Sequence, residues 1–74
     1  MNFQLNQIVI EIATEKRCII VASNENPWKK NRDMYNKTEK FPEDGCDYII
    51  LVEIKPNEYK GEKHVTKDQI KSIS

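Results

Sequence analysis

The residues with the clearest chemical potential in this sequence are cations interleaved with aromatic side chains. They lie close together along one stretch: Trp28, Lys29, Lys30, Arg32, Tyr35 and Lys37. Aromatic rings stack on unpaired bases while lysine and arginine neutralise phosphate, so the pattern is typical of a surface for RNA or single-stranded DNA. In the alternative interpretation, Trp28 and Tyr35 fold back as a lid on the core and the lysines face water.

The distribution of charge favours a local contact surface. Twelve basic and twelve acidic residues give a formal net charge of zero, which argues against a protein whose whole surface binds polyphosphate. From Trp28 to Lys40, however, there are five basic and two acidic residues, and Glu43, Asp44 and Asp47 follow. A solvated loop balanced for solubility would show the same dipolar pattern.

Catalytic and metal-binding residues are few. Nucleophilic catalysis needs a thiol or hydroxyl beside a base, and the chain has one histidine, His64, and two cysteines. Cys18 lies in an apolar run where a small buried side chain is expected, which leaves a Cys46–His64 pair as the remaining arrangement. These residues do not make a zinc site, and two glycines do not make a phosphate loop. We therefore expect no enzyme activity, cofactor or metal.

Binding remains as the expected activity, and two classes of partner fit it. One is RNA or single-stranded DNA. The other is a larger protein or nucleoprotein, because Trp, Tyr and Arg often anchor such interfaces, and in size the chain resembles the inhibitors carried by phages and mobile elements, including anti-CRISPR proteins. Tyr59, in the polar stretch Tyr59–His64, adds an exposed aromatic to the predicted binding residues. A membrane or a small-molecule substrate is not expected.

The stretch that organises the chain is Asp47–Lys55, in which the four residues Ile49–Val52 are all apolar. Large apolar residues on both alternating faces predict the central strand of a small, mostly antiparallel β domain. Pro56 argues against a helix here.

Two strands are predicted upstream of it. Ile8–Ile12 has isoleucine at every second position, which predicts a half-buried strand with the isoleucines facing inward. Arg17–Ser23 has few polar residues and predicts a second strand. The polar connection Ala13–Lys16 makes the pair a β-hairpin.

The segment 24–46 has no apolar periodicity. Segments of this length without a strand pattern tend to be functional or disordered, so we expect a long loop or a short helix. In the helical alternative, Asn26 is the N-cap and Pro27 the first helical residue. The segment is expected to end in a turn at Phe41–Gly45.

A further β-hairpin is predicted after the organising strand. Lys55–Glu58 has proline in the second place of an expected type I turn. Tyr59–Val65 then returns as a strand, and Gly61 in its middle either weakens the strand or marks a bulge.

One helical turn is predicted after this hairpin. Thr66 and Gln69 fit a capping box, with Val65 and Ile70 at the positions of a hydrophobic staple. We expect Ile70 and Ile73 to return to the core in a short final strand.

The order of these elements resembles the Src-homology-type (SH3-like) small β-barrels. The stretches that carry the resemblance are Asn6–Ile10, Asp47–Val52 and His64–Ile70. It implies a mainly β fold: a small five-stranded antiparallel SH3-like barrel with a long loop or short helix inserted at 24–46 and one helical turn before the last strand. Members that bind proline-rich peptides have an acidic, aromatic-rich loop. Here the loop is basic and the chain has one tryptophan, so proline-rich ligands are not implied.

The length of 74 residues predicts one domain, 1–74. No hydrophobic signal segment precedes the cysteines, so we expect a cytoplasmic protein with two reduced thiols. The longest apolar run is too short to cross a bilayer.

Overall fold

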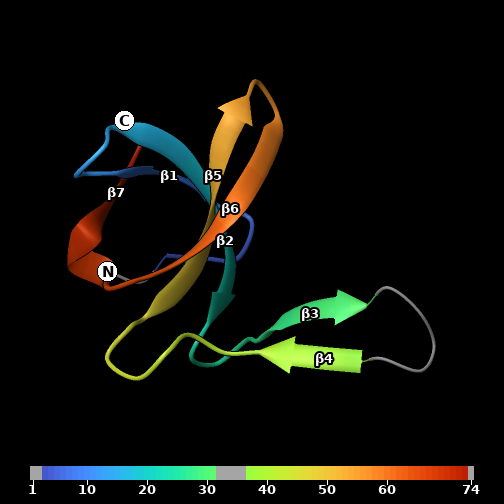
Figure 1. Cartoon of the computed structure of the whole chain (residues 1–74). Helices are drawn as coiled ribbons and strands as arrows, with labels where there is room; N and C mark the ends of the chain where they lie inside the picture. Colours follow the sequence, from blue (N-terminus) through green and yellow to red (C-terminus); the bar gives the residue numbers. More distant parts are fainter. Residues whose placement is uncertain (1–2, 32–36, 74) are drawn as a thin grey trace.

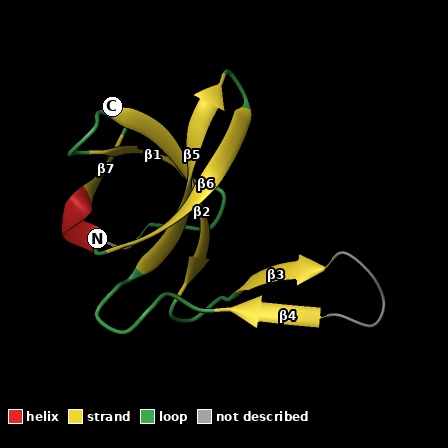
Figure 2. Cartoon of the chain, viewed as in Figure 1, coloured by secondary structure: helices red, strands yellow, loops and turns green. Residues whose placement is uncertain are grey.

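The computed structural model of the chain describes residues 3–31 and 37–73. Its main element is a five-stranded antiparallel sheet with the strand order β6-β5-β2-β1-β7 (Figure 1). The strands are β1 (Ile8–Glu11), β2 (Lys16–Ser23), β5 (Tyr48–Lys55), β6 (Glu58–Val65) and β7 (Ile70–Ser72). A separate two-stranded sheet consists of β3 (Trp28–Asn31) and β4 (Lys37–Lys40), and a 3₁₀ turn, η1 (Lys67–Gln69), precedes β7 (Figure 2).

The predicted mainly β fold with five antiparallel strands and one helical turn is confirmed, but the predicted barrel is wrong. The sheet is not closed, because β6 and β7 are its two edges. Closure would require β7 to pair with β6 as well as with β1, and the three described residues of β7 pair with β1 alone. The middle strand is β2 rather than the Asp47–Lys55 segment, whose strand β5 lies beside it.

The face of β1 that packs against the core is the opposite of the predicted one. Val9 is fully buried and Glu11 is 7% exposed. The isoleucines of Ile8–Ile12 lie outside the core, and the last of them is 49% exposed. Val9 is paired with the buried Cys18 of β2, and cross-strand partners share a face. The expectation that the isoleucines face inward was therefore wrong.

The core occupies one face of the sheet, called here the inner face. Its buried members come from all five strands of the sheet: Val9, Cys18, Ile20, Tyr48, Ile50, Val65 and Ile70. Phe3 packs against them, with its ring edge-on to Tyr48 at a centroid distance of 5.7 Å and its N–H donating to the Tyr48 hydroxyl at 3.0 Å. The predicted burial of Cys18 is confirmed.

The segment 24–46 contains a β-hairpin rather than a long loop or a helix. β3 and β4 are antiparallel, with Trp28 opposite Lys40 and Lys29 opposite Glu39. The Ser23 hydroxyl accepts hydrogen bonds from the main-chain N–H groups of residues 25 and 26. These bonds turn the chain from β2 toward β3. Pairing between two polar segments outweighs the weak local helix signal.

Two of the predicted turns differ in outcome. The turn in Phe41–Gly45 is confirmed: Gly45 has a φ of 86°, and the Cys46 N–H donates to the Glu43 carbonyl at 2.9 Å. The type I turn at Lys55–Glu58 is wrong, because Asn57 in its third place has a φ of 65°. A type I turn needs a negative φ there, whereas a type II turn accepts asparagine with a positive one.

The bulge at Gly61 is confirmed and supports a stability prediction. The β5–β6 register skips Gly61, whose φ is 89°, and an added Cβ would meet no atom within 4 Å. We expect Gly61→Ala to lower the free energy of unfolding by about 1 kcal/mol through backbone strain alone. Urea unfolding followed by circular dichroism measures this. The exposed Lys60→Ala is the control, and an equal loss in both variants would contradict the prediction.

The capping box before β7 is confirmed. Thr66 and Gln69 make the box, in which the Thr66 N–H donates to Gln69 Oε1 at 2.8 Å. The Gln69 N–H also donates to the Thr66 carbonyl at 3.0 Å, which closes the 3₁₀ turn. Ile70 reaches the core at 3% exposure, as expected. Ile73 is 41% exposed, so its predicted return to the core was wrong. β7 ends at Ser72, one residue before it.

Both thiols are free; Cys18 is buried and Cys46 half-buried. In the described parts of the chain, no helix has the length and apolar character needed to cross a membrane.

Candidate binding surface on the β3–β4 hairpin

The hairpin formed by β3 and β4 is the most distinctive surface feature of the molecule. It projects from the five-stranded sheet (Figure 1), and among the strands of that sheet its main neighbour is β2, from which the chain enters it. Its strand residues include four lysines and one glutamate: Lys29, Lys30, Lys37, Lys40 and Glu39. Lys29 and Glu39 are exposed, and Trp28 is half-buried at the base. The hairpin is therefore a basic ribbon with an aromatic residue at its root.

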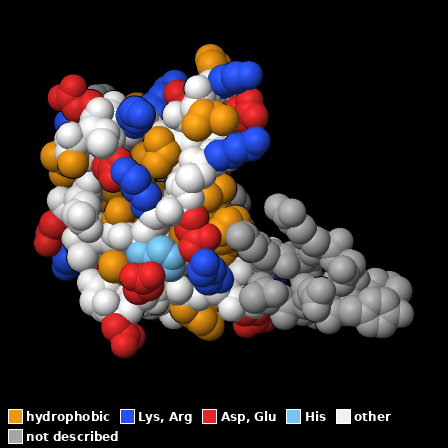
Figure 3. Space-filling view, viewed as in Figure 1, with side chains coloured by type: hydrophobic (Ala, Val, Ile, Leu, Met, Phe, Trp, Pro, Cys, Tyr) orange, Lys and Arg blue, Asp and Glu red, His pale blue; other side chains and the backbone are white. Residues whose placement is uncertain are grey.

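Three side chains fasten the base of the ribbon to β6. Lys40 Nζ lies 2.6 Å from Glu62 Oε2, and His64 Nε2 lies 2.8 Å from the same oxygen. His64 Nδ1 accepts a hydrogen bond from the Glu43 N–H at 3.0 Å. Figure 3 shows the imidazole among acidic side chains, with a basic one beside them. We call Lys40, Glu62 and His64 the anchor cluster.

The hydrogen bonds of His64 define its tautomer. A main-chain N–H can only donate, so Nδ1 is the acceptor and the proton of the neutral ring lies on Nε2, directed at Glu62. Lys40 lowers the pKa of Glu62 most by its hydrogen bond, and His64 lowers it further, against the opposing effect of burial. The cluster thus holds an ionised carboxylate between β4 and β6.

The anchor cluster includes His64, which the sequence paired with Cys46 as the remaining catalytic arrangement. Both ring nitrogens have partners, namely the Glu43 N–H and the Glu62 carboxylate. The Cys46–His64 hydrogen bond considered from the sequence is not formed between these two described residues.

The structure separates the predicted binding residues. Trp28, Lys29 and Lys30 lie on β3 and Lys37 lies on β4, so four of them belong to one ribbon. Arg32 and Tyr35 fall outside the described residues. Tyr59 lies on β6, in the other sheet.

Tyr59 is not the exposed aromatic that the sequence suggested. It is half-buried and paired with Glu53 on β5. Burial raises the pKa of its phenol, the charge and hydrogen bond of Glu53 raise it further, and Arg17 opposes them. Its hydroxyl therefore belongs to the sheet surface and not to the hairpin.

The anchor cluster was not predicted. Glu62 and His64 are two residues apart on one strand, so they share a face, and this spacing was the available signal. Their partner Lys40 comes from a segment without a strand pattern, so nothing local indicated the contact.

No protein-family model, curated protein or solved structure matches this chain.

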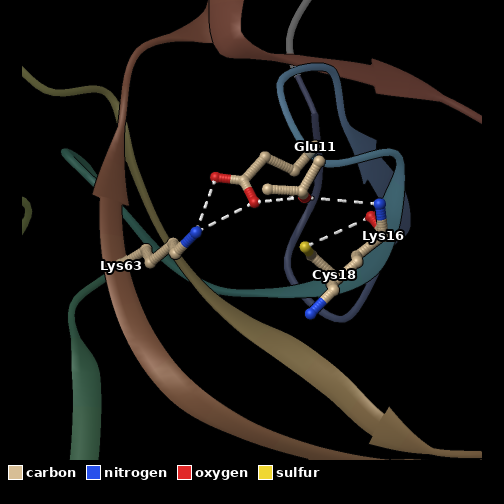
Figure 4. Close-up of polar contacts among 5 residues, drawn as sticks. Glu11, Lys16, Cys18 and Lys63 are labelled. Carbon is tan, nitrogen blue, oxygen red and sulfur yellow. Dashed lines mark hydrogen bonds and ion pairs between the residues drawn. The ribbon is translucent and has the colours of Figure 1, made fainter.

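A second polar cluster lies on the inner face of the sheet (Figure 4). Glu11 accepts hydrogen bonds from Lys63 Nζ at 3.0 and 3.1 Å and from the Thr14 hydroxyl at 2.7 Å. Thr14 lowers the pKa of Glu11 most, burial opposes it, and Lys63 lowers it further. This pair joins β1 to β6 across the inner face, because β5 and β2 separate the two strands in the sheet.

Cys18 lies beside this cluster, and its thiol donates to the Lys16 carbonyl at 3.5 Å. Burial raises the pKa of the thiol, and the charge of Glu11 raises it further. A protonated, fully buried thiol is a poor nucleophile. In the part of the chain that the structure describes, no group of three or more His, Cys, Asp or Glu residues could hold a metal ion.

A groove of about 620 Å³ lies beside Tyr48, between residues 3–5 and 23–26. Two of its polar groups already bind the main chain: Asp47 Oδ2 accepts from the Lys67 N–H at 2.8 Å, and Asn24 Nδ2 donates to the Cys46 carbonyl at 3.3 Å. These contacts hold loops together, so the hairpin is the stronger candidate site.

Proposed function

We propose that this chain is a non-enzymatic binding module that contacts a larger protein or nucleoprotein through the β3–β4 hairpin. The observation that carries the proposal is a basic ribbon that projects from the sheet and whose base the anchor cluster joins to β6. A two-stranded ribbon is marginally stable by itself in water, so the Lys40–Glu62 ion pair and the hydrogen bond from the Glu43 N–H to His64 support its base against β6.

The charge of the ribbon specifies the chemistry of the partner. The strand residues of β3 and β4 have an excess of three positive charges, in a chain whose formal net charge is zero. A surface of this kind attracts acidic partners and accelerates their association at low salt. The expected target is an acidic protein surface or the phosphate-rich face of a nucleoprotein.

The titratable clusters support a binding role over a catalytic one. Glu62 contacts both Lys40 and His64. Glu11 and Lys63 form an ion pair that spans the inner face. These contacts connect strands, which is a structural task.

The specific form of the proposal is an inhibitor of a host system, encoded by a phage or mobile element and of the anti-CRISPR type, acting in the cytoplasm. A projecting ribbon on a small rigid sheet suits the occupation of a site on a larger assembly. A fold-level resemblance to the SH3-like barrels belongs to the same proposal and is supported by the five antiparallel strands and the helical turn before the last one.

RNA or single-stranded DNA is the second candidate partner. It is favoured by Trp28 and Lys29, which follow each other on β3 and so offer an aromatic ring on one face of the ribbon and a cation on the other. Base stacking together with phosphate contacts would use both side chains. The two candidates differ in their response to salt, because phosphate contacts make affinity fall steeply as ionic strength rises.

The proposal is tested by capture of partners from host lysate with and without nuclease, using the native chain and the double variant Trp28→Ala, Lys29→Glu. We expect the variant to retain about a tenth or less of the captured partner, while its far-ultraviolet circular dichroism is unchanged. Lys60→Glu is the matched control, because Lys60 is a lysine on β6 whose side chain is 72% exposed.

The nuclease arm separates the candidates. Capture that survives nuclease supports the protein or nucleoprotein partner, whereas capture that disappears supports the nucleic acid. Equal capture by the native chain and the hairpin variant would overturn the assignment to β3–β4.

A further inference from the structure

The face of the sheet opposite the core, called here the outer face, carries an apolar row. Ile8 is paired with Ile19, and Ile19 with Leu51, so the row crosses β1, β2 and β5. Its members lie on the face opposite Val9 and Cys18, since neighbouring residues in a strand point to opposite faces. All three row residues remain partly exposed.

This row differs from the rest of the outer face. Near the hairpin, Ile49 and Ala22 are paired with each other and fully buried, and Pro42 is buried as well. The row of Ile8, Ile19 and Leu51 lacks such burial. Contiguous apolar surface in the middle of a small sheet is typical of an interaction site.

Charged residues of both signs lie directly beside the row. Arg17 lies two residues before Ile19 on β2, and Glu53 lies two residues after Leu51 on β5. Each therefore shares a face with its neighbour in the row. The β2–β5 register, in which Cys18 is opposite Val52, makes Arg17 and Glu53 neighbours. The face therefore presents two adjacent pairs, one apolar and one of opposite charge.

We propose that the outer face binds a second copy of this chain, with a two-fold axis parallel to the strands and midway between β2 and β5. Such an axis places Ile19 over the second copy's Leu51, and Arg17 over the second copy's Glu53. Each contact occurs twice, as the symmetry of a two-fold dimer requires, and two sheets packed face to face are a common arrangement.

The charges of the outer face favour a second copy over an unlike partner. Around the axis, the two copies of Arg17 and of Glu53 alternate, so each of these four charges faces one of opposite sign, while Glu62 beside Leu51 is already paired with Lys40. The formal net charge of zero adds no overall repulsion between two copies. This interface uses neither strand of the hairpin and does not depend on the partner that the hairpin binds.

The first test is the molar mass of the full chain in solution, by light scattering after size exclusion, over about a hundredfold range of concentration. We expect the native chain to pass from monomer to dimer as concentration rises. Leu51→Lys is expected to weaken the dimer at least about tenfold. Leu5→Lys is the control, because Leu5 is 38% exposed and lies in the N-terminal segment beside the groove. A native chain that stays monomeric throughout would overturn the proposal.

The second test exchanges charges and does not depend on the stability of a single variant. R17E alone and E53K alone are each expected to be monomeric, because four like charges would meet around the axis. An equimolar mixture of the two is expected to form a dimer, since one chain then presents two negative and the other two positive side chains. Circular dichroism confirms that each variant is folded. A mixture of folded variants that remains monomeric, while the native chain dimerises, would refute this geometry.

Discussion

Replacing Ile50 by alanine is expected to lower the free energy of unfolding by about 3 to 4 kcal/mol. Ile50 is fully buried in the inner-face core and is paired with Ile20 on β2, which is also fully buried. Truncation removes apolar contacts and leaves a cavity in a sheet whose core has few layers. A chain of this size derives only a few kcal/mol from one core, so the loss is a large fraction of its total stability. Urea unfolding monitored by circular dichroism measures it.

The control for this prediction is Ile54→Ala on the same strand. Ile54 is 53% exposed, so its truncation is expected to cost less than about 1 kcal/mol. If Ile50→Ala is unfolded in water, Ile50→Val provides the measurement, with an expected loss of about 1 kcal/mol. Equal losses at positions 50 and 54 would contradict the assignment of the core to the inner face.

The elements with local signals were predictable from the sequence. β5 and β2 contain β-branched residues, the bulge contains Gly61, and the turn before β7 contains Thr66 and Gln69. In each case the residue types favour the local backbone geometry, so the element could be identified without knowledge of any distant contact.

The orientation of β1 was not predictable from its own residues. Both alternating faces of Ile8–Ile12 contain apolar residues, so its pattern does not decide which face is buried. The inward position of Glu11 depends on Lys63, which is 52 residues away in sequence. A charged residue is expected inside only when a partner meets it, and that partner cannot be inferred from a local pattern.

The hairpin was missed for a related reason. β3 and β4 consist mostly of polar residues, and half-buried strands are recognised by apolar alternation. Their pairing and the anchor to Glu62 and His64 are tertiary contacts. Residue type alone identified Trp28 and Lys29 as candidate binding residues, whereas the base that holds them could be seen only in the fold.

The second large effect is expected at the Glu11–Lys63 pair, where Lys63→Met is predicted to cost about 2 kcal/mol at neutral pH. Removing one partner of a buried ion pair costs about 3 to 5 kcal/mol. We expect a smaller loss of stability here because water screens the Lys63 side chain, which is 45% exposed. The Glu11 side chain is only 9% exposed. Methionine keeps the apolar stem, so the change reports the lost charge and hydrogen bonds. Lys60→Met on the same strand is the control, with an expected change within about 0.5 kcal/mol.

The pH dependence of the Lys63→Met effect provides the decisive measurement. The folded chain lowers the pKa of Glu11, so the stability that its ionised form contributes is present above the pKa of the unfolded chain and is lost as pH falls through the folded pKa. Lys63 supplies part of that lowering, and burial opposes it. The native chain should therefore lose more stability than the variant as pH falls below 4.5, the ordinary pKa of this carboxyl, and the two curves should converge in acid. The lowered pKa of Glu62 acts in the same direction in both chains, so it cancels in their difference. A difference that stays constant across this range would mean that Lys63 stabilises β6 by packing and not by its charge on Glu11.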